Sequence, residues 1–235
     1  MIFSTKRMYA IFQKDLKDLS KNMFVGTTML MPIVLAAIYG AMGLDSIEIH
    51  YMMINLTFVA VTVFIQSAII AEEKEKNTLR NLMLSPATLT EILTGKSLVS
   101  FILTVITIVI CAFLTEYEPA SLLPVALAIL LSSVFYLILG TLLGLLSRSV
   151  VEASVLFTPV LFIFGFGSMV LGFAEDYPIL SIVEYLPNVQ IIQFAEKVEA
   201  GTAIAGMLTH LGIIALWVVG AAIATAIVYR KKEMD

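Results

Sequence analysis

Six runs of apolar residues, each long enough to cross a lipid bilayer, limit what this chain can fold into. A spanning helix needs about 20 predominantly apolar residues. The runs lie at residues 22–43, 49–71, 97–115, 121–146, 153–174 and 208–229. The composition agrees, because 60% of the 235 residues are hydrophobic and only 14% are charged, too little charge for a soluble surface. The sequence therefore predicts an all-α, polytopic membrane protein with one transmembrane domain over residues 1–235.

The lysine and arginine residues distinguish the two sides of the membrane. Thirteen of the fourteen lie on the side of the two termini and only Lys197 lies on the other, while the eighteen acidic residues divide equally. Positively charged connections stay in the cytoplasm. The sequence therefore predicts a multi-pass protein of a bacterial or archaeal cell membrane with both termini in the cytoplasm.

Residues 6–21 precede the first span and have apolar residues at helical spacing. The apolar face consists of Met8, Ile11, Phe12, Leu16 and Leu19, and the other faces carry Lys14, Asp15, Lys17 and Asp18. This pattern predicts a helix in the cytoplasmic membrane interface, with its lysines near anionic headgroups. An additional contact with a cytoplasmic partner is the alternative.

The stretch LTGKSL looks like the end of a phosphate-binding loop but lacks the first glycine of that motif. The motif needs a glycine five residues before Gly95, and Thr90 stands there. Thr88 and Glu91 have the spacing of a capping box, so we expect a helix to begin at Thr88 and to enter the third span. Lys96 would then reach toward the cytoplasmic headgroups. No cofactor, ATP or metal site is predicted on this chain.

The longest cytoplasmic connection, residues 72–96, predicts a rigid projection. A charged stem precedes a residue that tolerates a helix break, a short helix with an apolar face, and a proline stop. These parts are Glu72, Glu73 and Glu75, then Asn77, then Leu79, Leu82 and Met83, then Ser85 and Pro86. The residues alone are compatible with a solvated loop or with a docking element.

The same stretch closely resembles the loop between the second and third helices of ABC type 2 permeases, the drug and antibiotic export family. The shared pattern is Glu73, Glu75, Lys76, Thr78, Leu79, Leu82, Leu84, Ser85, Pro86, Glu91, Ile92, Leu93, Gly95 and Lys96, with Asn77 where glycine is usual. The segments LGTLLGLLSRSVVEASVLFTPVLF and YLPNVQIIQFAEKVEAG are similar to later parts of the family. The resemblance implies a permease without enzymatic activity of its own.

The resemblance also implies the partners of the chain. They are a cytoplasmic ABC ATPase that holds the ATP and Mg, a second permease copy in a homodimer or heterodimer, and membrane lipid, without nucleic acid. The residues expected to dock on the ATPase are Glu72, Glu73, Glu75, Asn77, Thr78, Leu79, Arg80, Leu82, Met83, Ser85 and Pro86. The apolar members would supply affinity, and the charged stem would supply orientation and association rate.

The second and fifth spans carry the residues that the resemblance places along a translocation path. Asn55, Thr62 and Gln66 share one helix face and serve either helix packing or a wet cavity. Pro159 and nearby glycines predict a kinked or broken fifth span. Its soft apolar surface would face either cargo or lipid and consists of Phe157, Phe162, Phe166 and Met169.

Residues 175–207 are too polar to span the membrane and form the predicted external segment. Breaks at Pro178, Pro187 and Gly201 predict short helices that dip partly into the outer leaflet. The segment either caps an exit or lies in the interface without a gating role.

The predicted function is export driven by an outside ATPase. No span has a central Asp, Glu, Lys or Arg of the kind that a secondary transporter uses. A membrane hydrolase is disfavoured because Phe166 stands where the nucleophile motif around Ser168 needs a glycine. The expected cargo is an amphipathic or hydrophobic compound, such as a drug, a peptide antibiotic or a lipid-like molecule. An exporter of sodium or another small ion, or a membrane scaffold without transport activity, is the alternative.

Overall fold

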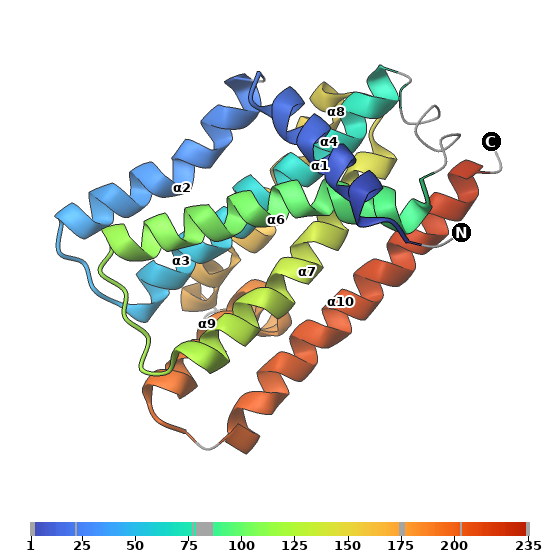
Figure 1. Cartoon of the computed structure of the whole chain (residues 1–235). Coiled ribbons are helices and arrows are strands. Elements are labelled where there is room, and N and C mark those ends of the chain that lie inside the picture. Colours follow the sequence, from blue (N-terminus) through green and yellow to red (C-terminus); the bar gives the residue numbers. More distant parts are fainter. Residues whose placement is uncertain are drawn as a thin grey trace.

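The computed structural model of the chain describes residues 3–21, 23–76, 78, 87–173, 177–202 and 204–233. Its α-helices are α1 (Thr5–Leu19), α2 (Met23–Ala41), α3 (Ile47–Thr57), α4 (Phe64–Glu75), α6 (Leu89–Leu114), α7 (Leu122–Leu146), α8 (Val150–Val160), α9 (Pro187–Glu199) and α10 (Ile204–Glu233). Two π-helical segments, η1 (Phe58–Val63) and η2 (Leu161–Gly165), and two 3₁₀ segments, η3 (Gly167–Phe173) and η4 (Pro178–Tyr185), complete the fold. Figure 1 shows the long helices side by side, with both termini at one end of the bundle.

The second span forms the centre of the bundle. α3, η1 and α4 join into one helix from Ile47 to Glu75, and its membrane-spanning part is entirely buried. It is in contact with α2, α6, α7 and α8. In a membrane protein, a helix that is apolar all round can face either lipid or other helices, and the complete burial of this one shows that it faces other helices. The remaining spans therefore pack around this helix.

Two glycines of α7 allow that helix to lie directly against the central helix. A Cβ atom at Gly140 would lie 2.7 Å from the carbonyl oxygen of Val63, and one at Gly144 would lie 2.8 Å from the carbonyl oxygen of Ser67. Gly140 and Gly144 are four residues apart, so they face the same way. This spacing of small residues is typical of close helix pairs in membranes.

The number of helices that can span a membrane is smaller in the described residues than the six predicted. Four helices are long and apolar enough, and a fifth span is counted if the segments Val150–Gly165 and Gly167–Phe173, bent by 50°, are taken together. The described apolar part of α2, Gly26–Ala41, is shorter. A polytopic helical membrane protein is confirmed, and the six-span topology stays a prediction. The predicted break in the fifth span is confirmed, with Pro159 inside α8.

The segment that precedes α10 forms two short helices, η4 and α9, whose boundaries lie at the predicted breaks. η4 begins at Pro178, α9 begins at Pro187, and Gly201 has a φ of +63° just after α9. α9 is buried against α3, α7 and α10, whereas η4 exposes Ile179 and Ile182. α9 therefore belongs to the core of the bundle, and only η4 resembles an interfacial helix.

We predict that one methyl group at the contact between α7 and the central helix is enough to destabilise the protein. Gly140→Ala should lower the free energy of unfolding by about 1–3 kcal/mol, because overpacking forces the helices apart. Gly220→Ala is the matched control, since no atom lies within 4 Å of a Cβ there. Thermal unfolding in detergent measures both variants. Equal melting temperatures for the two variants would contradict the close contact.

Candidate functional site

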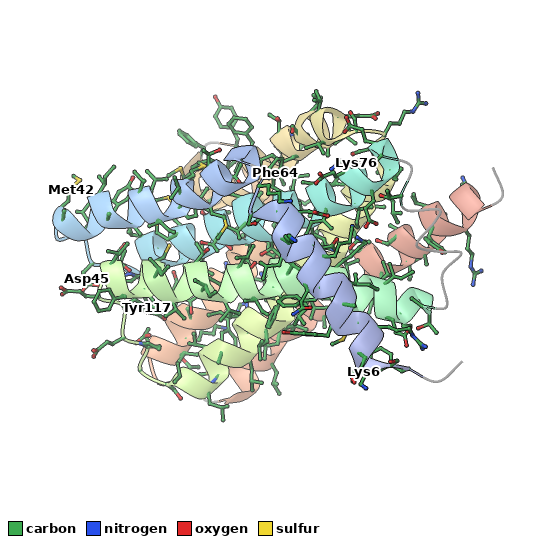
Figure 2. All side chains as sticks on the ribbon, turned by 45° about the horizontal axis from the view of Figure 1, so that its top comes forward. Lys6, Met42, Asp45, Phe64, Lys76 and Tyr117 are labelled. Atoms are coloured by element: carbon green, nitrogen blue, oxygen red, sulfur yellow. The ribbon has the colours of Figure 1, made fainter. Side chains whose placement is uncertain are left out.

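The end of α4 is a charged stretch that connects the central helix to four neighbouring helices. We call residues 72–76, which are Glu72, Glu73, Lys74, Glu75 and Lys76, the α4 hub. The hub directly precedes the segment expected to dock on an ATPase. Figure 2 shows Lys76 at the same end of the bundle as Lys6, and Met42, Asp45 and Tyr117 at the other end.

The first connection of the hub is a buried ion-pair cluster centred on Lys96 of α6. The Lys96 side chain is only 1% exposed, and its Nζ atom lies 3.0 Å from Oδ2 of Asp15 and 2.9 Å from Oε1 of Glu73. Lys14 joins the cluster from α1, with its Nζ atom 2.6 Å from Oε1 of Glu73 and 3.1 Å from Oδ1 of Asp15. Two ammonium groups and two carboxylates thus balance each other, which makes the burial of Lys96 tolerable.

The position of this cluster corrects two predictions. Lys96 does not reach toward the headgroups, and Asp15 does not lie on a solvent-exposed face of α1; Asp15 is 3% exposed. The cause is Gly95, where α1 crosses α6 so closely that a Cβ atom would lie 2.8 Å from the carbonyl oxygen of Met8. α1 therefore covers Lys96, and Asp15 rotates inward to pair with it, while Leu16 is left 40% exposed.

The first turn of α1 is attached to the first turn of α6. Thr88 caps α6 and forms the predicted capping box with Glu91, which is confirmed. Glu91 also accepts hydrogen bonds from the Arg7 guanidinium, at 2.9 Å from Nε and 2.7 Å from Nη2, and from the backbone N–H of Ser4. A bidentate arginine–carboxylate pair fixes both distance and orientation. Together with the Lys96 cluster, it holds α1 at two points along α6.

Two further charged residues of the hub, Lys74 and Glu75, bond to α7 and α8. Lys74 donates from Nζ to the carbonyl oxygens of Leu145, at 2.7 Å, and of Ser147. These groups end α7, where a positive charge is favourable because of the helix dipole. Glu75 accepts a hydrogen bond of 3.1 Å from the backbone N–H of Val150, the first residue of α8. A negative charge at a helix N-terminus is favourable for the same reason.

The ion pairs also keep Lys14 and Lys76 protonated. Burial lowers the pKa of Lys14, but its hydrogen bond to Glu73 and the negative charges of Asp15 and Glu73 outweigh burial and raise that pKa overall. The pKa of Lys76 is raised mainly by its hydrogen bond to Glu72, four residues earlier. Both lysines therefore stay positively charged throughout the physiological pH range.

Four of the residues predicted to dock on an ATPase belong to the described part of the chain. Glu72 pairs with Lys76 and is accessible, Glu75 is exposed at α8, and Thr78 is exposed with its hydroxyl donating to the Glu73 carbonyl oxygen at 3.3 Å. Glu73 is only 4% exposed, because its side chain pairs with lysines of α1 and α6. The prediction that Glu73 belongs to an exposed stem that docks on the ATPase is therefore wrong for its side chain. The predicted residues outside the described part are Asn77, Leu79, Arg80, Leu82, Met83, Ser85 and Pro86.

The polar residues of the second span are buried within the single chain. Thr62 shares a hydrogen bond of 2.7 Å with Thr104 of α6. Gln66 accepts from the Ser100 hydroxyl at 2.8 Å and donates to the Thr141 hydroxyl at 3.0 Å. These bonds join the central helix to α6 and α7, as the packing interpretation requires.

Asn55, the third polar residue on this face, bonds to α9 and keeps one unpaired oxygen. Its Nδ2 atom donates to the carbonyl oxygen of Asn188 at 2.9 Å. Its Oδ1 atom is buried without a partner among the described residues. The role of Asn55, Thr62 and Gln66 in translocation stays a prediction.

The residues of the fifth span predicted to form an apolar cargo surface do not all lie on one surface. Phe157 packs on Phe64 of α4, with ring centroids 5.0 Å apart. Phe162 and Met169 point outward and are 64% and 55% exposed, and Phe166 lies beside Phe162 at 6.3 Å. Phe157 is therefore part of the core contact between α4 and α8, and Phe166 is partly buried against the core between α2, α3 and α6. Phe162 and Met169 form an outer surface, and the role of all four in translocation stays a prediction.

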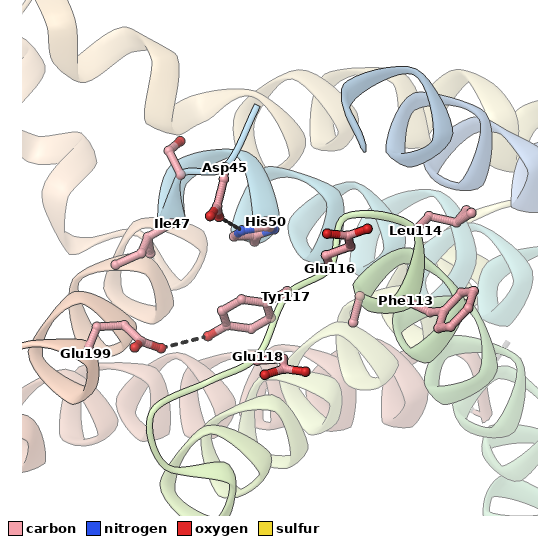
Figure 3. A pocket seen from close by; sticks show the side chains of 11 residues that line it. Asp45, Ile47, His50, Phe113, Leu114, Glu116, Tyr117, Glu118 and Glu199 are labelled. Atoms are coloured by element: carbon pink, nitrogen blue, oxygen red, sulfur yellow. Dashed lines mark hydrogen bonds and ion pairs between the residues drawn. The ribbon is translucent and has the colours of Figure 1, made fainter. Parts of the chain in front are cut away.

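A cavity of about 1090 Å³ opens at the end of the bundle opposite the termini. Figure 3 shows carboxylates around it that come from two loops, α2–α3 and α6–α7, and from the end of α9. Its acidic lining residues are Asp45, Glu116, Glu118 and Glu199. The described residues contain no group of three or more His, Cys, Asp or Glu side chains placed to hold a metal ion.

His50 and Tyr117 order the wall of this cavity. The His50 ring stacks on Tyr117 at 4.7 Å and lies 2.9 Å from Oδ1 of Asp45 through Nε2. The Tyr117 hydroxyl donates to Oε1 of Glu199 at 3.5 Å and accepts from the Tyr51 hydroxyl at 3.3 Å. Sequence reasoning missed the cavity because its residues lie far apart in the chain; the only signal was the excess of acidic residues on this side.

A family model described as ABC-2 family transporter protein matches residues 49–228 of the chain. The matched region contains the pair Glu73–Lys96 and leaves out α1, which supplies Lys14 and Asp15 to the same cluster. No curated protein gives a match. The resemblance inferred from the residues of the loop between the second and third helices is therefore confirmed.

We predict that Lys96 is the member of the cluster on which folding depends most. Lys96→Met should lower the free energy of unfolding by about 3–5 kcal/mol, because it leaves two buried carboxylates with one cation, Lys14, between them. Lys17→Met removes the same charge from an exposed position on α1 and should have little effect. Denaturation in detergent with increasing urea measures both variants.

A double variant separates the ion pair from simple loss of the lysine side chain. Asp15→Leu combined with Lys96→Met should recover most of the lost stability, because Glu73 keeps Lys14 as its partner. If the double variant is as unstable as the sum of its single variants, the pairing of Asp15 with Lys96 does not carry the stability.

Proposed function

The chain belongs to the ABC-2 family of transporter proteins, and we propose that it is the permease subunit of an ATP-driven exporter whose ATPase subunits are separate chains. The observation that carries this proposal is the α4 hub, which lies beside the predicted docking segment and connects it to four helices. A docking segment on a loosely attached loop could not move a membrane domain. A segment attached to α1, α6, α7 and α8 through charged contacts can.

The hub supports a specific route for the movement. A displacement of residues 77–86 by an ATPase would pull on the end of the central helix. The Lys96 cluster would pass the displacement to α1 and α6, and Lys74 and Glu75 would pass it to α7 and α8. Movement of a whole group of helices then requires only one small contact surface, since packed elements move as rigid bodies.

Two π-helical segments provide positions at which the helices could bend. η1 interrupts the central helix halfway along its length, η2 follows Pro159 in the fifth span, and the two segments are in contact. π-helical turns lack the regular hydrogen-bond ladder and are frequent at functional sites. We place the hinge between the hub and the opposite end of the bundle at this contact.

The acidic cavity indicates the charge of the transported compound. We propose export of an amphipathic or hydrophobic compound, and the carboxylates of the cavity favour one that carries a positive charge. A small cation such as sodium is the second candidate, and the same carboxylates favour it. An amphipathic cation accounts in addition for the exposed apolar surface at Phe162 and Met169.

The orientation in the membrane can be tested with two cysteines. In a Cys111→Ala background, Thr78→Cys and Thr202→Cys place exposed thiols at opposite ends of the bundle. A membrane-impermeant reagent should label Thr202→Cys from outside intact cells and Thr78→Cys only in inverted vesicles. Labelling of both from the same side would overturn the predicted topology.

The docking proposal predicts a strong effect of charge on the apolar face of residues 77–86. Leu79→Asp and Leu82→Asp should reduce recovery of the ATPase in co-purification at least tenfold, since each buried leucine contributes about 1.5–3 kcal/mol. Leu79→Met keeps an apolar side chain of similar size and should retain the ATPase. Glu72→Lys should give a milder loss that decreases with added salt, because salt screens the repulsion introduced by the charge reversal.

Gel filtration in detergent separates loss of docking from loss of folding. All variants should elute as the unaltered permease does, because Leu79 and Leu82 follow the end of α4 and Glu72 pairs with the exposed Lys76 near that end. Normal ATPase recovery and normal export by Leu79→Asp and Leu82→Asp would show that this segment is a solvated loop. The buried Glu73 is unsuitable for this test, because its charge reversal would disrupt the Lys96 cluster.

A further inference from the structure

An apolar groove of about 370 Å³ lies between α6, α7 and α10 at the end of the bundle that carries the termini. Its surface is mostly apolar, although Ser97, Thr141 and Thr225 also line it. The lining includes Leu93 of α6, Leu137, Ile138 and Leu145 of α7, and Ala222 and Ala226 of α10. Tyr229 and Arg230 line the same groove where α10 approaches its end.

The groove has the length of one leaflet of the membrane. Its lining on α10 runs from Ala222 to Arg230, which is about 12 Å along a helix that rises about 1.5 Å per residue. One leaflet accounts for about 15 Å of the hydrocarbon core. The groove therefore extends from the headgroup level, at Arg230, nearly to the middle of the bilayer.

The groove is open because α10 stands away from α6. α10 packs on α7 and α9, and most of its spanning surface is exposed. Ala222 and Ala226 have small side chains, which leave space beside α10, and residues of α7 line the groove next to them. An extended hydrocarbon chain fits such a shape, whereas a helix, with a diameter of about 10–12 Å, would need a wider space.

The polar end of the groove carries the positive charge of Arg230. Arg230 is exposed and has no carboxylate partner in the part of the chain that the structure describes. The carboxylates Asp15, Glu73 and Glu91 at the same end are already paired with Lys96, Lys14 and Arg7. A guanidinium group binds phosphate in a bidentate manner, and tyrosine is common at the headgroup level.

We propose that this groove binds one acyl chain of an anionic phospholipid, with the headgroup phosphate on Arg230. The apolar wall recognises the chain, and Arg230 together with the neighbouring Lys231 recognises the negative charge. The site is separate from the hub and from the acidic cavity, so it does not depend on the identity of the cargo or of the ATPase.

The test is native mass spectrometry of the purified chain with phosphatidylglycerol and with phosphatidylcholine of the same acyl length. The unaltered chain should retain phosphatidylglycerol preferentially. Arg230→Gln should reduce its occupancy about fivefold, which corresponds to about 1 kcal/mol for one basic residue near anionic lipid. Arg148→Gln removes an exposed arginine from the same end outside the groove and should leave the occupancy unchanged.

A second pair of variants tests the apolar part of the groove. Ala226→Phe fills the groove and should displace both lipids, whereas Ile227→Phe places the same ring next to it on the exposed side of α10 and should not. Equal loss for Arg230→Gln and Arg148→Gln, or unchanged lipid binding by Ala226→Phe, would overturn the proposal. Dissociation of a permease dimer by Ala226→Phe without loss of lipid would show that a second copy of the chain covers the groove instead.

Discussion

The buried ammonium group of Lys96 is the interaction on which the organisation of one end of the molecule depends. A charge that is 1% exposed is stable only if opposite charges meet it. Asp15 comes from α1 and Glu73 from α4, so pairing Lys96 joins three segments that are far apart in the sequence. The hydrophobic effect places the helices in the bilayer but cannot select this arrangement, because lipid is as apolar as leucine. Charge pairing and close glycine contacts select it.

This dependence explains why the α4 hub has alternating charges. Glu73 faces the Lys96 cluster, Lys74 faces the end of α7, and Glu75 faces the start of α8. Successive residues on a helix point about 100° apart, so three neighbours can reach three different helices. Each residue has a charge opposite to that of its partner. Glu73 pairs with a lysine, Lys74 lies at the negative C-terminal end of α7, and Glu75 lies at the positive N-terminal end of α8. The opposite end of the bundle carries acidic residues around a cavity.

Much of the helical layout could be predicted from the sequence, and the contacts of single side chains could not. The capping box at Thr88, the breaks at Pro178 and Pro187 and the bent fifth span depend on neighbouring residues, so local spacing predicts them. The inward positions of Asp15 and Lys96 depend on where α1 crosses α6, which is decided by the missing side chain of Gly95. The same limit applies to the acidic cavity, whose walls come from separate loops and α9.

The order of residues within the Lys96 cluster has a consequence for synthesis of the protein. Asp15 and Glu73 are both translated before Lys96, so the two carboxylates are already at the membrane when the lysine leaves the ribosome. When α6 enters the bilayer, Lys96 can therefore pair with carboxylates that are already present. An unpaired ammonium group in the hydrocarbon, which would be costly, is avoided. With the order reversed, that helix would have to insert first and find its partners later. The chain is thus arranged so that each step of its assembly prepares the next.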